Sequence, residues 1–256
     1  MKVRLDKALV ERGLVGSRER AQALILAGRV LVGEQKVEKP GTAVAEDVAL
    51  RVLGEDMRYV SRGGLKLERA LEYWAIALDG RGCVDVGAST GGFTDCMLQH
   101  GAKSVLAVDT GYGQIAHKLR VDERVRLMER CNARLLGVGE LVTGAGGIDF
   151  LAMDVSFISA TLVLPAVMRA LVGEGEAWRG EVVVLVKPQF EAGREHVGKG
   201  GIVREQAGQD IAIARVKECV LELGGKGVEV IDSPITGMEG NREYLLHGWF
   251  GEGVEA

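Results

Sequence analysis

The feature that most constrains the fold is a regular alternation of strand-like and helix-like segments along most of the chain. Seven short apolar segments are separated by stretches that mostly have a helical pattern. We expect strands at residues 83–87, 104–109, 125–129, 148–154, 182–187, 227–232 and 244–250. Such alternation is typical of a mostly parallel sheet that is covered by helices on both faces. The sequence therefore predicts an α/β fold built on a Rossmann-like sheet.

A glycine-rich loop follows the first expected strand. In the stretch "VDVGASTGGFTD" the glycines are Gly87, Gly91 and Gly92. This spacing differs from the G-x-G-x-x-G of dinucleotide folds, and no G-K-[ST] follows to make a P-loop. Asp85 comes directly before the glycines, where a carboxylate is a poor neighbour for a pyrophosphate. The loop therefore favours a cationic ligand without phosphate, such as S-adenosylmethionine, and a tight turn without a ligand is the alternative.

Further polar residues end the strands that follow. Asp109 comes 22 residues after Gly87, where an acid can accept hydrogen bonds from both hydroxyls of a ribose. Asp154 and Lys187 also fall at strand ends, and ligands of open α/β sheets bind beyond the carboxyl ends of the strands. Asp154 could instead cap a turn, and Lys187 could extend from the core into solvent. Together they predict an acid and an amine on one edge, beside the ligand.

The chemistry of this edge indicates the kind of acceptor. The sequence contains no NPPY-like or DPPY-like motif for methylation of an exocyclic base amine, and no Pro-Cys pair for attack on a pyrimidine ring. Lysine and carboxylate side chains suit an unactivated hydroxyl, which must be oriented and must lose its proton as a methyl group is transferred. A ribose 2′-hydroxyl fits this description.

The N-terminal sixty residues have a different character. "RLDKALVERGL" and "GSRERAQALILAGRV" predict two short helices, with Ser17 as an N-cap and Gly13 and Gly28 as stops. "VLVGEQKV" predicts a hairpin, and residues 47–53 a further strand. Residues 1–39 hold nine Lys and Arg against five acids, which gives them a net charge of +4. Since the whole chain has a net charge of −4, residues 40–256 carry −8. We therefore expect a small basic α+β domain at 1–60, a polar linker near 53–64, and a larger domain at 61–256.

Composition excludes several other classes. The four cysteines are far apart and form no CxxC pair, so we expect neither a metal site nor disulfides. The N-terminus is charged throughout, unlike a secretory signal, and the longest apolar runs, such as "VVVLV", are too short to span a bilayer. These features predict a cytoplasmic protein that does not enter membranes.

The stretch "RLDKALVERGLVGSRERAQALILAGRVLVGE" resembles a small RNA-binding module. That module is shared by a small-subunit ribosomal protein, many pseudouridine synthases and tyrosyl-tRNA synthetases. The resemblance implies contacts with the phosphates of folded RNA. The residues that it assigns to these contacts are Arg4, Lys7, Arg18, Arg20 and Arg29. A patch of Arg and Lys without aromatic residues fits recognition of RNA by shape and backbone.

The larger domain resembles the FtsJ-type ribose 2′-O-methyltransferases, and the whole chain resembles the TlyA, or haemolysin A-like, family. The stretches that carry this are "YVSRGGLKLERAL", "VDVGASTGGFTD", "AVDTGYGQIAHKLR", "MDVSFIS", "LVKPQFEAGREHVGKGGIVR" and "SPITGMEGNREYLL". The resemblance implies a catalytic tetrad of Lys66, Asp154, Lys187 and Glu243, with Glu243 brought to the same edge because the last strand runs antiparallel. It also implies S-adenosylmethionine as cofactor and a cytidine ribose of ribosomal RNA, free or in a ribosomal subunit, as acceptor. The "EQAGQD" that follows "GGIVR" departs from the family pattern.

The expected donor site comprises Asp85, Gly87, Ser89, Gly91, Gly92, Phe93, Asp109 and Asp154. Two other functions remain open from the sequence. One is an RNA-binding ribosome assembly factor with weak or no transfer activity. The other is the membrane lysis that the name haemolysin suggests, although the chain lacks a basic amphipathic helix of useful length.

Overall fold

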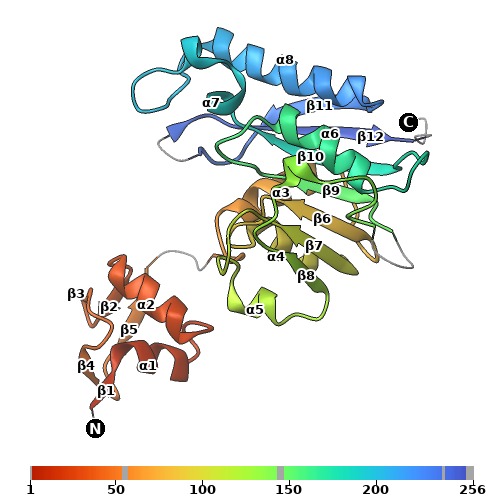
Figure 1. Cartoon of the computed structure of the whole chain (residues 1–256). Coiled ribbons are helices and arrows are strands. Elements are labelled where there is room, and N and C mark those ends of the chain that lie inside the picture. Colours follow the sequence, from red (N-terminus) through yellow and green to blue (C-terminus); the bar gives the residue numbers. More distant parts are fainter. Residues whose placement is uncertain (1, 54–56, 143–146, 238–239, 252–256) are drawn as a thin grey trace. The chain divides into compact units, whose positions relative to one another are not determined.

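The computed structural model describes residues 2–53, 57–142, 147–237 and 240–251. Residues 54–56, within the expected linker, lie outside the described residues. The chain divides into two compact units, Met1–Arg58 and Tyr59–Ala256, and Figure 1 labels the elements of each.

The N-terminal unit is a small α+β fold. Its elements are β1 (Lys2–Arg4), α1 (Leu5–Glu11), α2 (Arg18–Leu26), β2 (Val30–Val32), β3 (Gln35–Lys36), β4 (Ala43–Ala45) and β5 (Leu50–Val52). β2 pairs antiparallel with β3 and with β5, which confirms the expected hairpin and the strand after it. The antiparallel pair of β1 and β4 was not expected from the sequence, because each strand has only three residues.

Local signals in the sequence account for the helix ends of this unit. The Ser17 side chain accepts a hydrogen bond from the Arg20 N–H, as an N-cap does. Gly13 lies just beyond α1 with φ of +66°, a conformation that a residue with a Cβ rarely adopts. The two helices bury Leu5, Leu9 and Ile25 in a core of their own.

The C-terminal unit is built on one seven-stranded sheet. Its strands are β6 (Gly82–Val86), β7 (Ser104–Val108), β8 (Val125–Met128), β9 (Phe150–Met153), β10 (Gly180–Val186), β11 (Lys226–Asp232) and β12 (Tyr244–Phe250). Their order is β11-β12-β10-β9-β6-β7-β8. The helical elements are α3 (Gly63–Tyr73), α4 (Gly92–Gln99), α5 (His117–Arg120), η1 (Ala133–Leu135), α6 (Ala160–Ala170), α7 (Pro188–Glu191), η2 (Arg194–His196) and α8 (Gln206–Glu222). The mostly parallel, seven-stranded α/β fold is therefore confirmed.

One strand runs against the others and determines what meets at the functional edge. β12 is antiparallel to both β10 and β11, whereas β10, β9, β6, β7 and β8 are parallel. Val186, at the end of β10, is paired with Tyr244, at the start of β12. Lys187 and Glu243 therefore leave neighbouring strands at the same edge of the sheet.

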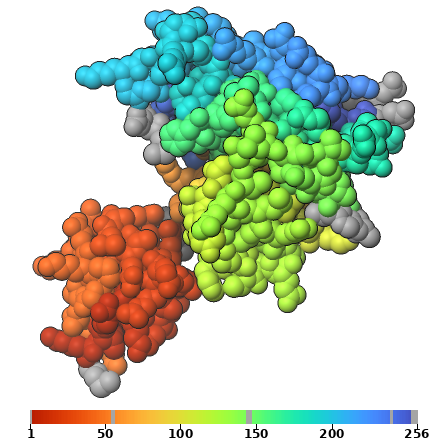
Figure 2. Space-filling model, viewed as in Figure 1, coloured from red at the N-terminus to blue at the C-terminus, as the bar shows by residue number. Residues whose placement is uncertain are grey.

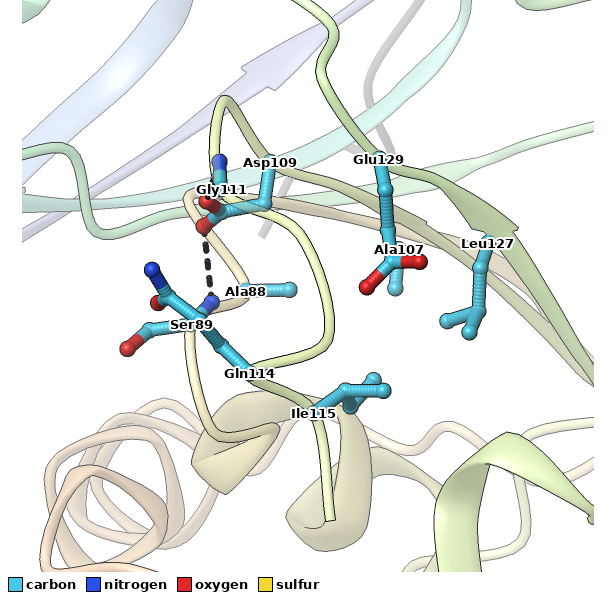
Figure 3. A pocket seen from close by; sticks show the side chains of 9 residues that line it. All are labelled: Ala88, Ser89, Ala107, Asp109, Gly111, Gln114, Ile115, Leu127 and Glu129. Carbon is cyan, nitrogen blue, oxygen red and sulfur yellow. Dashed lines mark hydrogen bonds between the residues drawn. The ribbon is translucent and has the colours of Figure 1, made fainter. Parts of the chain in front are cut away.

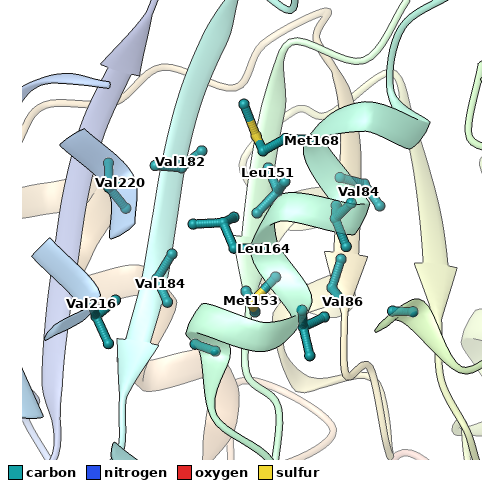
Figure 4. Packing of buried hydrophobic residues seen from close by; sticks show 14 of the residues in the cluster. Val84, Val86, Leu151, Met153, Leu164, Met168, Val182, Val184, Val216 and Val220 are labelled. Carbon is teal, nitrogen blue, oxygen red and sulfur yellow. The ribbon is translucent and has the colours of Figure 1, made fainter. Parts of the chain in front are cut away.

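Each face of the sheet has its own apolar core. Alternate strand residues such as Val84, Leu151 and Val184 face α6 and α8, whose Leu164 and Val216 pack onto them (Figure 4). The residues between them face α3 and α4 on the other side. The outer side of α8 is exposed and forms part of the blue surface at the top of Figure 2. Burial on both faces explains why the central strands are continuously apolar.

The first helix of this unit is shorter than the sequence suggests. Leu67 and Leu71 are buried on one face of α3, as their spacing predicts, but the helix ends at Tyr73. Trp74 and Leu78 continue the helical spacing of Leu67 and Leu71 in the sequence, but they lie beyond the end of the helix. The backbone turns at Ala75, which has φ of +51°. Leu78 follows this turn and is also buried, but it is not part of the helix.

Candidate active site

The loop between β6 and α4 has the backbone that its glycines predict. Gly87 has φ of +89°, and a Cβ there would lie 2.8 Å from the carbonyl carbon of Asp154. Gly91 has φ of +93° and forms the N-cap of α4. These positions allow the loop to turn sharply between the ends of β6 and β9. The glycines therefore allow this tightly packed loop to form, whether or not they also contact a ligand.

Asp85 lies beneath this loop. It is fully buried, and its Oδ2 accepts hydrogen bonds from the Thr94 N–H (2.9 Å) and hydroxyl (2.6 Å). Oδ1 has no hydrogen-bond partner among the described residues. Burial raises the pKa of Asp85 to about 7, the charge of Asp154 adds to this effect, and the Thr94 hydroxyl opposes it. The carboxyl group thus ties the end of β6 to the first turn of α4, across the glycine-rich loop.

Asp109 connects the two loops beside it. Its Oδ2 accepts a hydrogen bond from the Ser89 N–H (2.8 Å), and its Oδ1 accepts one from the Gly111 N–H (2.6 Å). Figure 3 shows it at the wall of a cavity with Gln114 and Glu129. Each carboxylate oxygen still has a lone pair for a further donor. Asp109 is therefore placed to accept hydrogen bonds from hydroxyl groups in this cavity.

A larger cleft opens at the carboxyl ends of β6, β9 and β10. It has a volume of about 310 Å³, at the lower end of the range that is usual for small-molecule sites. The expected donor residues that line it are Gly87, Ser89, Gly92, Phe93 and Asp154. Asp85 and Gly91 are not among the described residues that line the cleft, and Asp109 lines the cavity of Figure 3.

The four residues of the expected tetrad form two ion pairs at this cleft. Lys66 Nζ lies 2.5 Å from Glu243 Oε2, and both side chains are buried. Lys187 Nζ lies 2.6 Å from Asp154 Oδ1. Lys66, Asp154 and Lys187 line the cleft itself. Lys187 is thus paired with Asp154, and Glu243 with Lys66.

Sequence reasoning missed two residues at the edge of the cleft. Ser156 lines the cleft and accepts a hydrogen bond from Lys187 Nζ at 2.7 Å. Phe157 follows it with φ of +64° and a side chain that is 90% exposed. Both belong to the "MDVSFIS" stretch that carried the resemblance, so their position two and three residues after Asp154 was the available signal. An exposed aromatic ring on a strained backbone is uncommon outside functional sites.

The basic residues of the N-terminal unit are partly engaged with one acid. Asp6 is fully buried and accepts hydrogen bonds from Arg4, Arg18 and Gln22 at 2.9–3.0 Å. The hydrogen bond from Arg4 is the main cause that holds the pKa of Asp6 well below its usual range. The side chains of Arg4 and Arg18 nevertheless remain 51% and 53% exposed.

The other three expected phosphate contacts are placed differently. Lys7 forms an exposed ion pair with Glu11 at 3.3 Å. Arg29 donates from Nε to the Leu53 carbonyl oxygen at 2.8 Å. Arg20 is half-buried at the start of α2.

No helix in the described ranges is both long enough and apolar enough to cross a membrane. The same ranges contain no group of three or more His, Cys, Asp or Glu side chains arranged to hold a metal ion.

The fold and the cleft together define a methyltransferase of the Rossmann-like class. The model of the FtsJ-like methyltransferases matches residues 59–250, and that of the S4 domain matches residues 3–49. The chain belongs to the FtsJ-like methyltransferase family and carries an N-terminal S4 domain.

Three known proteins are similar over nearly the whole chain. The Bacillus subtilis protein YqxC is 48% identical over 99% of this chain and 88% of its own. The 16S/23S rRNA (cytidine-2′-O)-methyltransferase TlyA of Mycobacterium tuberculosis is 46% identical over 96% of this chain and 89% of its own. The solved structure of a hemolysin-named protein from Streptococcus thermophilus has a TM-score of 0.73 and 43% identity, and covers 98% of this chain and 89% of that chain.

Proposed function

We propose that this protein transfers the methyl group of S-adenosylmethionine to a ribose 2′-hydroxyl of ribosomal RNA. The observation that carries the proposal is the pair of lysine–carboxylate contacts, Lys66–Glu243 and Lys187–Asp154, beside the glycine loop in one cleft. The activity in the name of the M. tuberculosis relative supports the same acceptor, and a cytidine in particular.

The residues around the glycine loop suit S-adenosylmethionine. Gly87 allows backbone to approach a ligand closely, and Asp109 offers carboxylate oxygens for ribose hydroxyls. Ile115 and Leu127 are apolar side chains that line the cavity of Figure 3 beside Asp109. S-adenosylmethionine, when bound, supplies an electrophilic methyl group.

The tetrad prepares the acceptor. The ammonium of Lys187, held by Asp154, donates a hydrogen bond to the 2′ oxygen and stabilises the negative charge that develops there. Asp154 is the neighbouring group that can accept the proton of the hydroxyl. Lys66 and Glu243 compensate each other's charge, so that this pair adds little net charge to the cleft.

The N-terminal unit is proposed to supply the RNA affinity. Arg4 and Arg18 present half-exposed guanidinium groups, although they share Asp6, and the half-buried Arg20 adds a third cation. Phe157 offers an exposed ring beside the cleft, on which an unpaired base can stack.

The test is labelled methyl transfer from S-adenosylmethionine onto each purified ribosomal subunit and onto protein-free ribosomal RNA, followed by mapping of the methylated ribose. An RNA with a single 2′-deoxy substitution at the mapped nucleotide should be inert. Methylation of a base in that RNA would contradict the proposed acceptor. Tight RNA binding without any transfer would favour the assembly-factor alternative. Calorimetric binding of NAD, with none of S-adenosylmethionine, would contradict the proposed donor.

A further inference from the structure

Two segments at the edge of the cleft are joined by successive contacts. One is residues 154–159, which follow β9, and the other is residues 187–191, which follow β10. The Lys187 ammonium donates a hydrogen bond to Ser156 Oγ, the rings of Phe157 and Phe190 lie 5.6 Å apart, and Ser159 Oγ donates to Glu191 Oε2 at 2.5 Å. The position of Lys187 is therefore coupled to the segment that carries Ser156.

The two contacts of the Lys187 ammonium differ in kind. Asp154 Oδ1 lies 2.6 Å from Nζ but lacks the angles of a hydrogen bond, so it supplies charge. Ser156 Oγ accepts a hydrogen bond from Nζ at 2.7 Å, and hydrogen bonds are directional. An ammonium group has three N–H donors whose directions are fixed relative to one another. Because Ser156 fixes one of them, it restricts where the remaining donors can point.

The segment that carries Ser156 is held at both ends. On one side, the Asp154 N–H donates to the Val86 carbonyl oxygen at 2.9 Å. On the other side, the buried carboxyl group of Glu191 accepts hydrogen bonds from the Ser159 hydroxyl and, at 2.7 Å, from the Ala160 N–H. These anchors restrict the backbone on either side of Ser156, so that Ser156 can serve as a reference for a flexible lysine.

We propose that Ser156 is a positioning residue, which directs the ammonium of Lys187 toward the acceptor hydroxyl. The inference rests on the proposed methyl transfer and deepens it, since Asp154 and Lys187 alone would leave the lysine charged but free to turn. Ser156 lines the cleft, so its hydroxyl lies on the wall that the acceptor would face.

The kinetic test compares Ser156→Ala, Ser156→Val and Ser156→Thr in the full chain. Threonine keeps the hydroxyl, and valine has nearly the same shape without it. Loss of a hydrogen bond to a charged group should lower kcat about 10- to 100-fold in the Ala and Val variants, with KM for RNA and for S-adenosylmethionine nearly unchanged. The Thr variant should recover most of the rate.

Ser159→Ala is the matched control. It removes a hydroxyl from the same segment, but one that contacts Glu191 and not Lys187. The hydrogen bond from the Ala160 N–H to Glu191 still anchors the segment in this variant, so it should lower the melting temperature and keep kcat close to that of the original protein. An equal loss of kcat in Ser159→Ala and Ser156→Ala would overturn the proposal, because general loosening of the segment would then explain both.

A readout without RNA separates this proposal from the proposed function. The 15N signal of the Lys187 side-chain ammonium, assigned by its absence in Lys187→Met, should show slow hydrogen exchange in the original protein and fast exchange in Ser156→Ala. Unchanged exchange would refute the positioning role even if the protein methylates RNA. If no RNA is methylated, the proposed function fails, and the exchange data still decide whether Ser156 holds Lys187.

Discussion

Asp6 in the N-terminal unit and Asp85 in the C-terminal unit are both completely buried, yet their surroundings move their pKa values in opposite directions. Asp6 accepts hydrogen bonds from two guanidinium groups, which stabilise its charged form. Asp85 accepts hydrogen bonds only from the neutral groups of Thr94 among the described residues, so desolvation decides.

The difference shows that burial alone does not predict the charge of an acid. In the N-terminal unit, a buried negative charge holds two arginines in place and offsets part of a basic surface. In the C-terminal unit, the acid stabilises a loop by accepting hydrogen bonds. The cleft contains a third arrangement, in which Asp154 lies beside an ammonium that faces open space.

The largest expected effect comes from the pair of Asp154 and Lys187 in the cleft. Replacement of Lys187 by Met should lower the single-turnover rate of methyl transfer about 10²- to 10³-fold, because the acceptor loses the ammonium that orients it and stabilises its developing negative charge. Calorimetric affinity for S-adenosylmethionine should change little. Lys226→Met, on an exposed lysine at the start of β11, is the control. Unchanged rates on saturating RNA would show that Lys187 takes no part in the chemistry.

Replacement of Asp6 by Asn tests how much the buried acid of the N-terminal unit contributes to stability. The loss of charge-assisted hydrogen bonds from Arg4 and Arg18 should lower the local stability of α1 and α2 by about 1–3 kcal/mol, since both arginines can turn to water in the variant. Native-state hydrogen exchange of the helix amides measures this in the full chain. Glu11→Gln breaks only an exposed pair with Lys7 and should cost less than about 1 kcal/mol. Equal effects of the two variants would remove the distinction between buried and surface acids.

The pH dependence of stability should differ in sign between the two aspartates. Asp6 has a lowered pKa, so its stabilisation is present above pH ~4, the usual range of an unfolded Asp, and is lost as the pH falls further. Asp85 has a pKa raised to about 7, so the folded state binds the proton more strongly. Its contribution is present below pH ~4 and is lost as the pH rises toward 7.

The contribution of Asp85 can be measured by chemical unfolding of the C-terminal unit, monitored by the fluorescence of its three tryptophans. The free energy of unfolding should fall between pH ~4 and 7, and the fall should become shallower in Asp85→Asn. Asp232→Asn, at an exposed acid on β11, should leave the slope as it is. An identical slope in Asp85→Asn and the original protein would mean that Asp85 does not titrate in this range.

The smallest expected effect concerns RNA. If Arg18 contacts a phosphate, Arg18→Ala should flatten the log–log salt dependence of RNA binding by about 0.7–0.9, because one fewer counterion is released. Lys217→Ala, on the exposed side of α8, should leave the slope unchanged. An unaltered slope in Arg18→Ala would indicate that Asp6, and not RNA, is the functional partner of this arginine.

The sequence by itself determined the elements and their kind. Period and turn residues identified all seven strands of the large sheet, and Ser17 and Gly13 mark helix ends that the structure confirms. The glycine spacing also indicated a sharp loop after β6. These features depend on steric limits and hydrogen bonds within a few residues, which a single stretch of sequence already contains.

Only the tertiary structure decided which charged groups meet. Lys66 and Glu243 are 177 residues apart, and their pairing depends on β12 running antiparallel beside β10. A family resemblance could name these two residues, but no local pattern does. The arginine partners of Asp6, the isolation of Asp85 and the contact of Ser156 with Lys187 were likewise invisible in the sequence. Electrostatic and hydrogen-bond partners depend on distance in space and on exclusion of water, and both are set when the two faces of the sheet are covered.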